Sequence, residues 1–222
     1  MNNRYEEIDD EAQSQTFNQL GILCLDGSGS MTLEGKRGQT LAESVNLAVR
    51  EFLGYFKTSS IVNNFSIAVV TFDGKSEVHT PIKRLVDIDD NAKYDPTVGH
   101  GGRTFIGGAL EKAEYLAKEF LSKPEASYIP SSVIVLVMSD GMCDRPQDSK
   151  RIAERLKQSG KITICCSFFS SQHVGDADKQ QAQQDLQEIA SGVNCYKTTY
   201  DAEGLRKFFI ASMSIKNGKP TH

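Results

Sequence analysis

Short apolar runs alternate with longer amphipathic stretches from about residue 20 to the end of the chain. The run Val133–Met138 is continuous, as is typical of a parallel strand that helices cover on both faces. Phe65–Phe72 is rich in β-branched and aromatic residues and ends at Asp73-Gly74, a turn signal. Strands are therefore predicted over residues 22–25, 65–72, 133–138, 162–169 and 195–197.

The stretches between these runs carry apolar residues at helical spacing. After Leu41, for example, Val45, Ala48, Phe52 and Phe56 fall on one side of a helix. The same spacing predicts helices over residues 41–56, 106–120, 148–159 and 179–190. A last helix carries Leu205, Phe208, Phe209 and Met213 on its inner side.

This alternation predicts a doubly wound α/β fold, with a mostly parallel central sheet and helices on both faces. Glu77–Ile88 predicts a further strand, and Pro81 favours an edge position because proline cannot donate a ladder hydrogen bond. With no internal repeat and no long linker, we expect a single domain over residues 18–215. Residues 1–17 are predicted to be a loose lead-in and residues 216–222 a tail.

Composition narrows the function classes. The chain has 222 residues, 39% of them hydrophobic, and a net charge of −4, which argues against a nucleic-acid-binding surface. No signal peptide and no run of ~20 apolar residues is present, so we expect a cytoplasmic protein that does not contact a membrane. The five cysteines show no CxxC spacing and are interpreted as reduced core thiols.

Polar residues of one chemical kind follow two predicted strands and a glycine-rich loop. Asp26-Gly27-Ser28-Gly29-Ser30 follows the first strand, Asp140 follows the run at 133–138, and Thr104 follows Gly99-His100-Gly101-Gly102-Arg103. Ligands of open α/β sheets bind outside the carboxyl ends of the strands, where the strand order reverses. We therefore expect these side chains to meet.

Their chemistry fits a hard divalent cation. Mg²⁺ takes six oxygens at roughly 2.0–2.1 Å and keeps some of its waters. The hydroxyls of Ser28, Ser30 and Thr104 are small neutral donors, and the carboxylates of Asp26 and Asp140 balance the charge. The sequence predicts a metal site of these five residues that holds Mg²⁺, with Mn²⁺ or Ca²⁺ as substitutes.

The segments LCLDGSGSM, GGRT and VLVMSDG resemble, in order, the metal-ion-dependent adhesion site (MIDAS) of von Willebrand factor type A domains. The resemblance covers about residues 18–215 and implies a Rossmann-like sheet with one antiparallel edge strand. It implies Ser28 and Ser30 as direct ligands and Thr104 as a direct or water-bridged one. Asp26 and Asp140 would act mainly through water.

The resemblance also implies a non-enzymatic adhesion-type domain. A partner protein would present Asp or Glu to the metal and complete its coordination. The closing stretch LRKFFIASMSI resembles the stand-alone cytosolic members found in bacterial tellurite-resistance and stress gene clusters. The sequence indicates neither the partner nor the oligomeric state.

Plainer interpretations exist for each residue. Asp-Gly-Ser-Gly-Ser is an ordinary turn composition, Asp140-Gly141 could be a capping turn, and Thr104 could be an N-cap. Asp73 and Asp144 could join the outer shell of the site, although turn or cap roles are favoured for both. Arg103 is expected to face solvent, and Cys143 to be an inert thiol.

The main rival function is a phosphatase-type hydrolase with Asp26 as nucleophile. Enzymes resembling haloacid dehalogenase phosphatases place a second acid two residues later, where this chain has Ser28. A Gly-x-Ser-x-Gly elbow, a Walker A motif and a complete Gly-x-Gly-x-x-Gly are all missing. A third alternative is a structural scaffold with a vestigial site.

Overall fold

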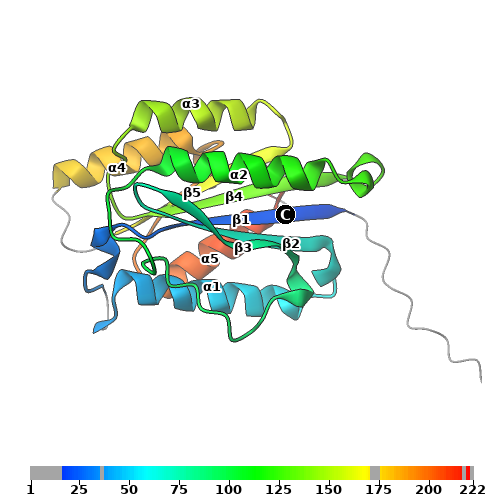
Figure 1. Cartoon of the computed structure of the whole chain (residues 1–222), viewed down its shortest axis with the longest axis horizontal. Coiled ribbons are helices and arrows are strands. Elements are labelled where there is room, and N and C mark those ends of the chain that lie inside the picture. The colour runs from blue at the N-terminus through cyan, green and yellow to red at the C-terminus, as the bar shows by residue number, and fades with distance from the viewer. Residues whose placement is uncertain (1–16, 36–37, 171–175, 217–218, 221–222) are drawn as a thin grey trace, which may run out of the picture.

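The computed structural model describes residues 17–35, 38–170, 176–216 and 219–220. Its main sheet has six strands in the order β3-β2-β1-β4-β5-β6, and only β3 runs antiparallel to its neighbour (Figure 1). The strands are β1 (Asn18–Asp26), β2 (Phe65–Phe72), β3 (Ser76–Arg84), β4 (Ser131–Ser139), β5 (Ile162–Phe169) and β6 (Tyr196–Thr199).

Helices cover both faces of this sheet. They are α1 (Leu41–Lys57), α2 (Ile106–Leu121), α3 (Pro146–Lys157), α4 (Asp176–Ile189) and α5 (Ala202–Met213). Helices α1 and α5 pack together on one face, while α2, α3 and α4 cover the other (Figure 1). The predicted doubly wound α/β fold with an antiparallel edge strand is therefore confirmed.

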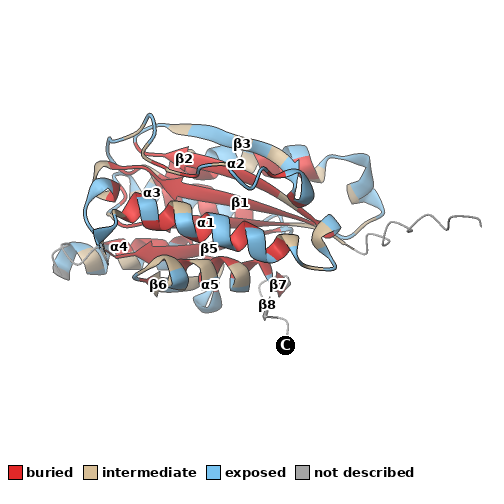
Figure 2. Ribbon diagram, turned by 90° about the horizontal axis from the view of Figure 1, so that it is seen from below, coloured by how far each residue is buried: buried red, intermediate tan, exposed pale blue. Residues whose placement is uncertain are grey.

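The core lies on both sides of the central strands. Strands β1 and β4 are buried almost throughout, as are the inward faces of the helices. Figure 2 shows the buried strand β1 and the mixture of buried and exposed positions on α1. All five cysteines are buried and free, as predicted for core thiols. Within the described ranges, no helix has both the length and the apolar character needed to cross a membrane.

Several element ends differ from the predicted ones by a few residues. The edge strand stops at Arg84 because Leu85–Asp87 turn into a short 3-10 helix that buries Leu85. Helix α1 starts after a capping box in which the Thr40 hydroxyl accepts from Glu43 N and the Glu43 carboxylate accepts from Thr40 N. Helix α3 begins earlier than expected, with Pro146 in its first turn.

The two chain ends are only partly described. The predicted lead-in at 1–17 lies, apart from Phe17, outside the described residues. At the junction of the predicted domain and the predicted tail at 216–222, Ile215–Lys216 (β7) pairs with Lys219–Pro220 (β8) as a separate antiparallel ribbon.

The connections place a switch point beside β1. From β1 the chain passes through α1 to β2, and from β3 it passes through α2 to β4 on the other side of β1. Loops leaving the carboxyl ends of β1 and β4 therefore diverge, which is where open α/β sheets bind ligands. Asp26 ends β1, and Asp140 directly follows β4.

Candidate metal centre

Asp26 is fully buried at the end of β1, and both of its carboxylate oxygens accept hydrogen bonds. Oδ1 accepts from Ser28 N at 2.8 Å, and Oδ2 accepts from Ser139 Oγ at 2.5 Å. Burial raises the pKa of Asp26, against the hydrogen bonds from Ser139 and Ser28. The Asp26 carboxylate is thus held in place, and it shapes the loop that follows β1.

The two predicted serine ligands lie side by side in that loop. Ser28 Oγ is 3.1 Å from Ser30 Oγ, and Ser30 Oγ donates to Asp140 Oδ1 at 2.8 Å. A serine oxygen that donates its proton still has lone pairs free. Ser28 and Ser30 can therefore offer oxygen donors to a cation while Asp140 orients one of them.

Asp140 has the most unusual environment. It is completely buried, and its Oδ2 has no hydrogen-bond partner within the described part of the chain. Burial and then the neighbouring Asp26 charge raise the pKa of Asp140 to about 7. An unpaired buried carboxylate oxygen is costly, and a bound cation would offset that cost.

Thr104 lies beside the same group of hydroxyls. A Cβ atom built on Gly141 would lie 3.6 Å from Thr104 Oγ1 and 3.9 Å from Ser30 Oγ. The N-cap of α2 is Phe105, with no side-chain cap bond, so the alternative N-cap role for Thr104 is wrong. Thr104 is buried, and its carbonyl accepts from Asp144 N at 2.8 Å.

The five predicted residues thus come together, and their donors fit a hard cation. They offer hydroxyl and carboxylate oxygens, the ligands that Mg²⁺ prefers. Within the described ranges, no three or more His, Cys, Asp or Glu side chains are grouped to hold a metal. The fit therefore depends on Ser28, Ser30 and Thr104, and on the unpaired Asp140 oxygen.

Asp73, at the end of β2, does more than the turn role that its sequence favours. Its Oδ1 accepts from Lys75 N at 2.9 Å, which is the turn, but Oδ2 accepts from Gly101 N at 3.1 Å and Gly102 N at 2.9 Å. Burial alone would raise its pKa, yet the backbone donors, chiefly Lys75 and Gly102, and the neighbouring His100 lower it to about 2. Asp73 therefore holds the glycine-rich loop as an ionised acceptor.

His100, in the glycine-rich loop, makes a further contact with Asp73. Its side chain is fully buried, with Nδ1 3.1 Å from Asp73 Oδ1 and Nε2 3.0 Å from Thr71 Oγ1. Among the described residues, Nδ1 makes no contact of good hydrogen-bond geometry, although it lies close to the Asp73 carboxylate. A histidine in a glycine-rich loop gives no sequence signal for such a contact.

The loop that Asp73 holds packs directly on the serine loop. Gly29 N donates to the Gly102 carbonyl at 3.1 Å, and Phe105 N donates to the Asp73 carbonyl at 2.9 Å. A Cβ on Gly27 would lie only 2.0 Å from the Pro96 carbonyl oxygen. The serine loop and the Thr104 loop are thus positioned against each other by backbone contacts.

The other candidate residues lie farther out. Arg103 is exposed, as expected, and Asp144 is exposed as well. Cys143 is buried, with its sulfur 3.2 Å from Ser149 Oγ.

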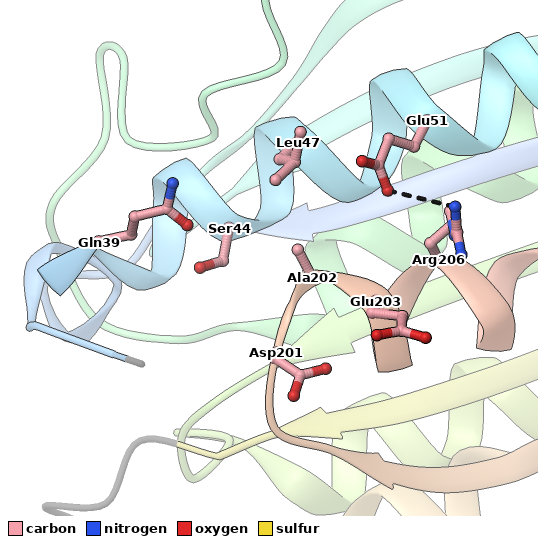
Figure 3. A pocket seen from close by; sticks show the side chains of 8 residues that line it. All are labelled: Gln39, Ser44, Leu47, Glu51, Asp201, Ala202, Glu203 and Arg206. Carbon is pink, nitrogen blue, oxygen red and sulfur yellow. Dashed lines mark ion pairs between the residues drawn. The ribbon is translucent and has the colours of Figure 1, made fainter. Parts of the chain in front are cut away.

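A separate pocket of about 290 Å³ lies between α1 and the start of α5 (Figure 3). None of the five predicted ligands lines it. Its charges are largely paired, since Arg206 Nη1 is 3.5 Å from Glu51 Oε2 and Glu203 accepts from Lys207 Nζ at 2.6 Å. We assign it no role in the metal centre.

Solved structures share this fold at low sequence identity. The pilus adhesin SpaC from Lactobacillus rhamnosus GG matches with a TM-score of 0.67 and 12% identity, over 87% of this chain and 30% of that one. Proximal thread matrix protein 1 from the mussel byssus, with a zinc-occupied MIDAS motif, matches with a TM-score of 0.61 and 17% identity. That match covers 89% of this chain and 45% of the mussel protein.

A von Willebrand factor type A structure from Catenulispora acidiphila matches with a TM-score of 0.63 and 18% identity, over 89% of this chain and 43% of that one. The chain therefore spans less than half the length of these three structures. At such identities the matches show the fold alone. No curated protein matches the sequence.

The family model for the von Willebrand factor type A domain matches residues 22–142. This segment is more than half of the chain and includes every predicted ligand from Asp26 to Asp140. Domains of this family are often adhesion or protein-interaction modules with a MIDAS metal. The chain belongs to the von Willebrand factor type A domain family.

Proposed function

We propose that this chain is a non-enzymatic, Mg²⁺-dependent protein-interaction domain that binds an acidic side chain of a partner protein. The observation that carries the proposal is Asp140 Oδ2, a buried carboxylate oxygen without a hydrogen-bond partner in the described part of the chain. Asp140 lies in one cluster with the hydroxyls of Ser28 and Ser30. Ser30 Oγ connects the cluster, because it lies next to Ser28 Oγ and donates to Asp140 Oδ1.

The hydrogen bonds that these residues already make indicate how each would contact the metal. Ser28 and Ser30 are direct ligands, and Thr104 is a direct or water-bridged one. Asp26 already accepts from Ser28 N and Ser139 Oγ, so it suits an indirect role through water. Asp140 acts mainly through water as well, and it fixes Ser30. When bound, the ion supplies a Lewis-acid position that a carboxylate of the partner can fill.

The donor atoms of the five predicted ligands favour Mg²⁺ over zinc. The mussel byssus protein holds zinc at its MIDAS motif, which supports a divalent ion at the equivalent place. Zinc sites in proteins usually draw on Cys sulfur and His nitrogen, and all five predicted ligands here offer oxygen. Mn²⁺ and Ca²⁺ would substitute for Mg²⁺.

A hydrolase function is disfavoured by the state of Asp26. A nucleophilic carboxylate needs an accessible oxygen, but Asp26 is fully buried and hydrogen-bonded through both oxygens. Release of phosphate from a generic phosphoester, lost in Asp26→Asn, would overturn the non-enzymatic assignment.

The cellular setting is proposed on sequence alone. The stretch LRKFFIASMSI forms most of α5, and it resembles the cytosolic tellurite-resistance group. We therefore place the chain in the cytoplasm of a stress-response system. Unchanged tellurite survival after deletion of its gene would contradict this placement.

Calorimetric titration of the purified chain with Mg²⁺ and Mn²⁺ tests the metal site directly. We expect one binding site in the wild type and none in Ser28→Ala/Ser30→Ala. Pull-downs with Mg²⁺, with EDTA and with Asp26→Ala then test the partner. A partner retained under all three conditions would favour the vestigial scaffold instead.

A further inference from the structure

A second pocket begins one residue away from the proposed metal ligands. It has a volume of about 450 Å³, and its walls come from the β2–β3 turn, α2 and the segment just before α3. Phe105, which lines it, directly follows Thr104 in the chain. Arg145 lines it too and follows Asp144, whose N donates to the Thr104 carbonyl at 2.8 Å. The lining of the pocket is therefore directly connected to the segment that carries Thr104.

The pocket is cationic although the whole chain carries a net charge of −4. Its lining includes Lys75, Lys112 and Arg145 but a single carboxylate, Glu111. Lys75 pairs with Glu77 at 2.8 Å, and both side chains are more than half exposed, so this pair is weak. Among the described residues, no carboxylate lies within ion-pair distance of Lys112 or Arg145. Two cations are thus left for a ligand.

Arg145 is held in a geometry that suits a carboxylate. Its guanidinium carbon lies 3.7 Å from the centroid of the Phe105 ring. Stacking of this kind fixes the planar group and leaves its N–H edge for a bidentate contact with a carboxylate. Tyr115, 66% exposed, adds an aromatic wall against which the rest of a ligand can pack.

Ser76 also lines the pocket, but its hydroxyl is not accessible to a ligand. Ser76 Oγ is buried and has no hydrogen-bond partner among the described residues. A Cβ on Gly108 would lie only 2.8 Å from it, so Ser76 and Gly108 are closely packed here. The ligand contacts of the pocket therefore come from its two cations, Lys112 and Arg145.

We infer that this pocket binds a second carboxylate of the same partner segment whose first carboxylate reaches the metal. The inference rests on the proposed function and specifies the partner further. The occupant is an extended segment with two acidic side chains, one for the metal and one for Arg145 and Lys112. A segment with a single acid would leave the pocket cations without a counter-charge.

Fluorescent peptides test this with a defined probe. One peptide carries a single Glu in a Gly/Ser body, and four others add a second Glu one to four residues later. Anisotropy is measured on the Mn²⁺-loaded full chain. We expect the best two-acid peptide to bind roughly five- to tenfold more tightly than the single-acid peptide, and the gain to fall at high salt.

Two double variants that remove the same charge test whether the gain in peptide affinity comes from the pocket. Lys112→Gln/Arg145→Gln should abolish the gain from the second acid while leaving Mn²⁺ affinity unchanged. Lys118→Gln/Arg151→Gln removes the same charge from neighbouring exposed positions and should keep the gain. Mn²⁺ affinity, read separately by electron paramagnetic resonance, shows that each variant retains its folded metal site.

The outcomes separate the two proposals. If wild type fails to bind Mn²⁺, the proposed function fails and this inference with it. If Mn²⁺ binds but the second acid brings no gain, only the inference is overturned. If none of the peptides binds the Mn²⁺-loaded chain, the acidic-ligand part of the proposed function fails together with the inference. A gain that persists in Lys112→Gln/Arg145→Gln overturns the inference alone.

Discussion

Ser30 Oγ donates a 2.8 Å hydrogen bond to Asp140 Oδ1, although 110 positions separate the two residues in the chain. The bond ties the loop after β1 to the carboxyl end of β4. It also directs the serine proton toward the carboxylate, so that the lone pairs of the hydroxyl stay available to a cation. One contact thus joins the two main sequence signals of the site.

Replacing Ser30 by alanine removes both a ligand and the partner of Asp140. We expect Ser30→Ala to weaken Mg²⁺ binding by roughly tenfold or more, since a ligand or its orienting partner is typically worth that much. Isothermal titration calorimetry measures it. Ser127→Ala, which alters an exposed hydroxyl bonded to the Pro124 carbonyl, should leave the affinity unchanged. Equal affinities in the two variants would remove Ser30 from the site.

The metal-free chain should lose stability as pH rises from about 4 to about 7. Burial, and then Asp26, raise the pKa of Asp140 to about 7, so the folded state holds a proton that the unfolded state has released. Stability from this group is complete below its ordinary pKa and is lost as pH passes the raised value. In EDTA, we expect the free energy of unfolding to be about 2 kcal/mol lower at pH 8 than at pH 5. This loss corresponds to a melting temperature roughly 5 °C lower.

Asp140→Asn isolates this effect from other titrating groups. The amide cannot ionise, so the pH-dependent part due to Asp140 should vanish and the variant should melt above wild type at pH 8 in EDTA. Mg²⁺ should raise the melting temperature of wild type and not of the variant. A variant with the same pH profile as wild type would show that Asp140 does not titrate in this range.

Asp73 should prove necessary for the metal site although it is not a predicted ligand. Asp73→Ala removes the acceptor of Gly101 N and Gly102 N and leaves buried His100 without its charged neighbour. We expect a loss of about 2–3 kcal/mol in urea unfolding and weaker Mg²⁺ binding, because the loop that carries Thr104 loosens. Asp89→Ala, at an exposed turn where the Asp89 carboxylate accepts from Asn91 N, is the control and should change neither quantity appreciably. Retained Mg²⁺ affinity in Asp73→Ala would contradict the positioning role.

Two glycine-to-alanine changes should have opposite signs. A Cβ on Gly27 would meet the Pro96 carbonyl oxygen at 2.0 Å, and backbone cannot move aside cheaply. Gly27→Ala should therefore cost about 2 kcal/mol or more and disrupt metal binding. Gly54 lies inside α1 with nothing within 4 Å, so Gly54→Ala should stabilise by about 0.5–1 kcal/mol. Chemical denaturation of both variants checks the pair, and a harmless Gly27→Ala would exclude close packing of the two loops.

The sequence determined the fold class through local signals. Continuous apolar runs predicted buried parallel strands, and helical spacing predicted the covering helices, because each pattern records which faces are buried. Boundaries were less well determined. Arg84 ends β3 where Leu85 turns inward to the core, a choice made by packing and not by local preference.

The sequence also determined which residues gather at the switch point. Asp26 ends β1 and Asp140 follows the adjacent parallel strand β4, so their proximity is a consequence of topology once those strands are recognised. Thr104 was placed by its motif alone, and its N-cap alternative was excluded only by the geometry of α2.

Only the tertiary structure decided how the loops around these residues are held and charged. The bonds from Asp73 to Gly101 and Gly102, and the stacking of Arg145 on Phe105, join segments far apart in the chain. The raised pKa of Asp140 likewise depends on its burial beside Asp26. Periodicity and motif spacing record the burial and order of single segments. Contacts between loops depend on three-dimensional packing, which no local pattern encodes.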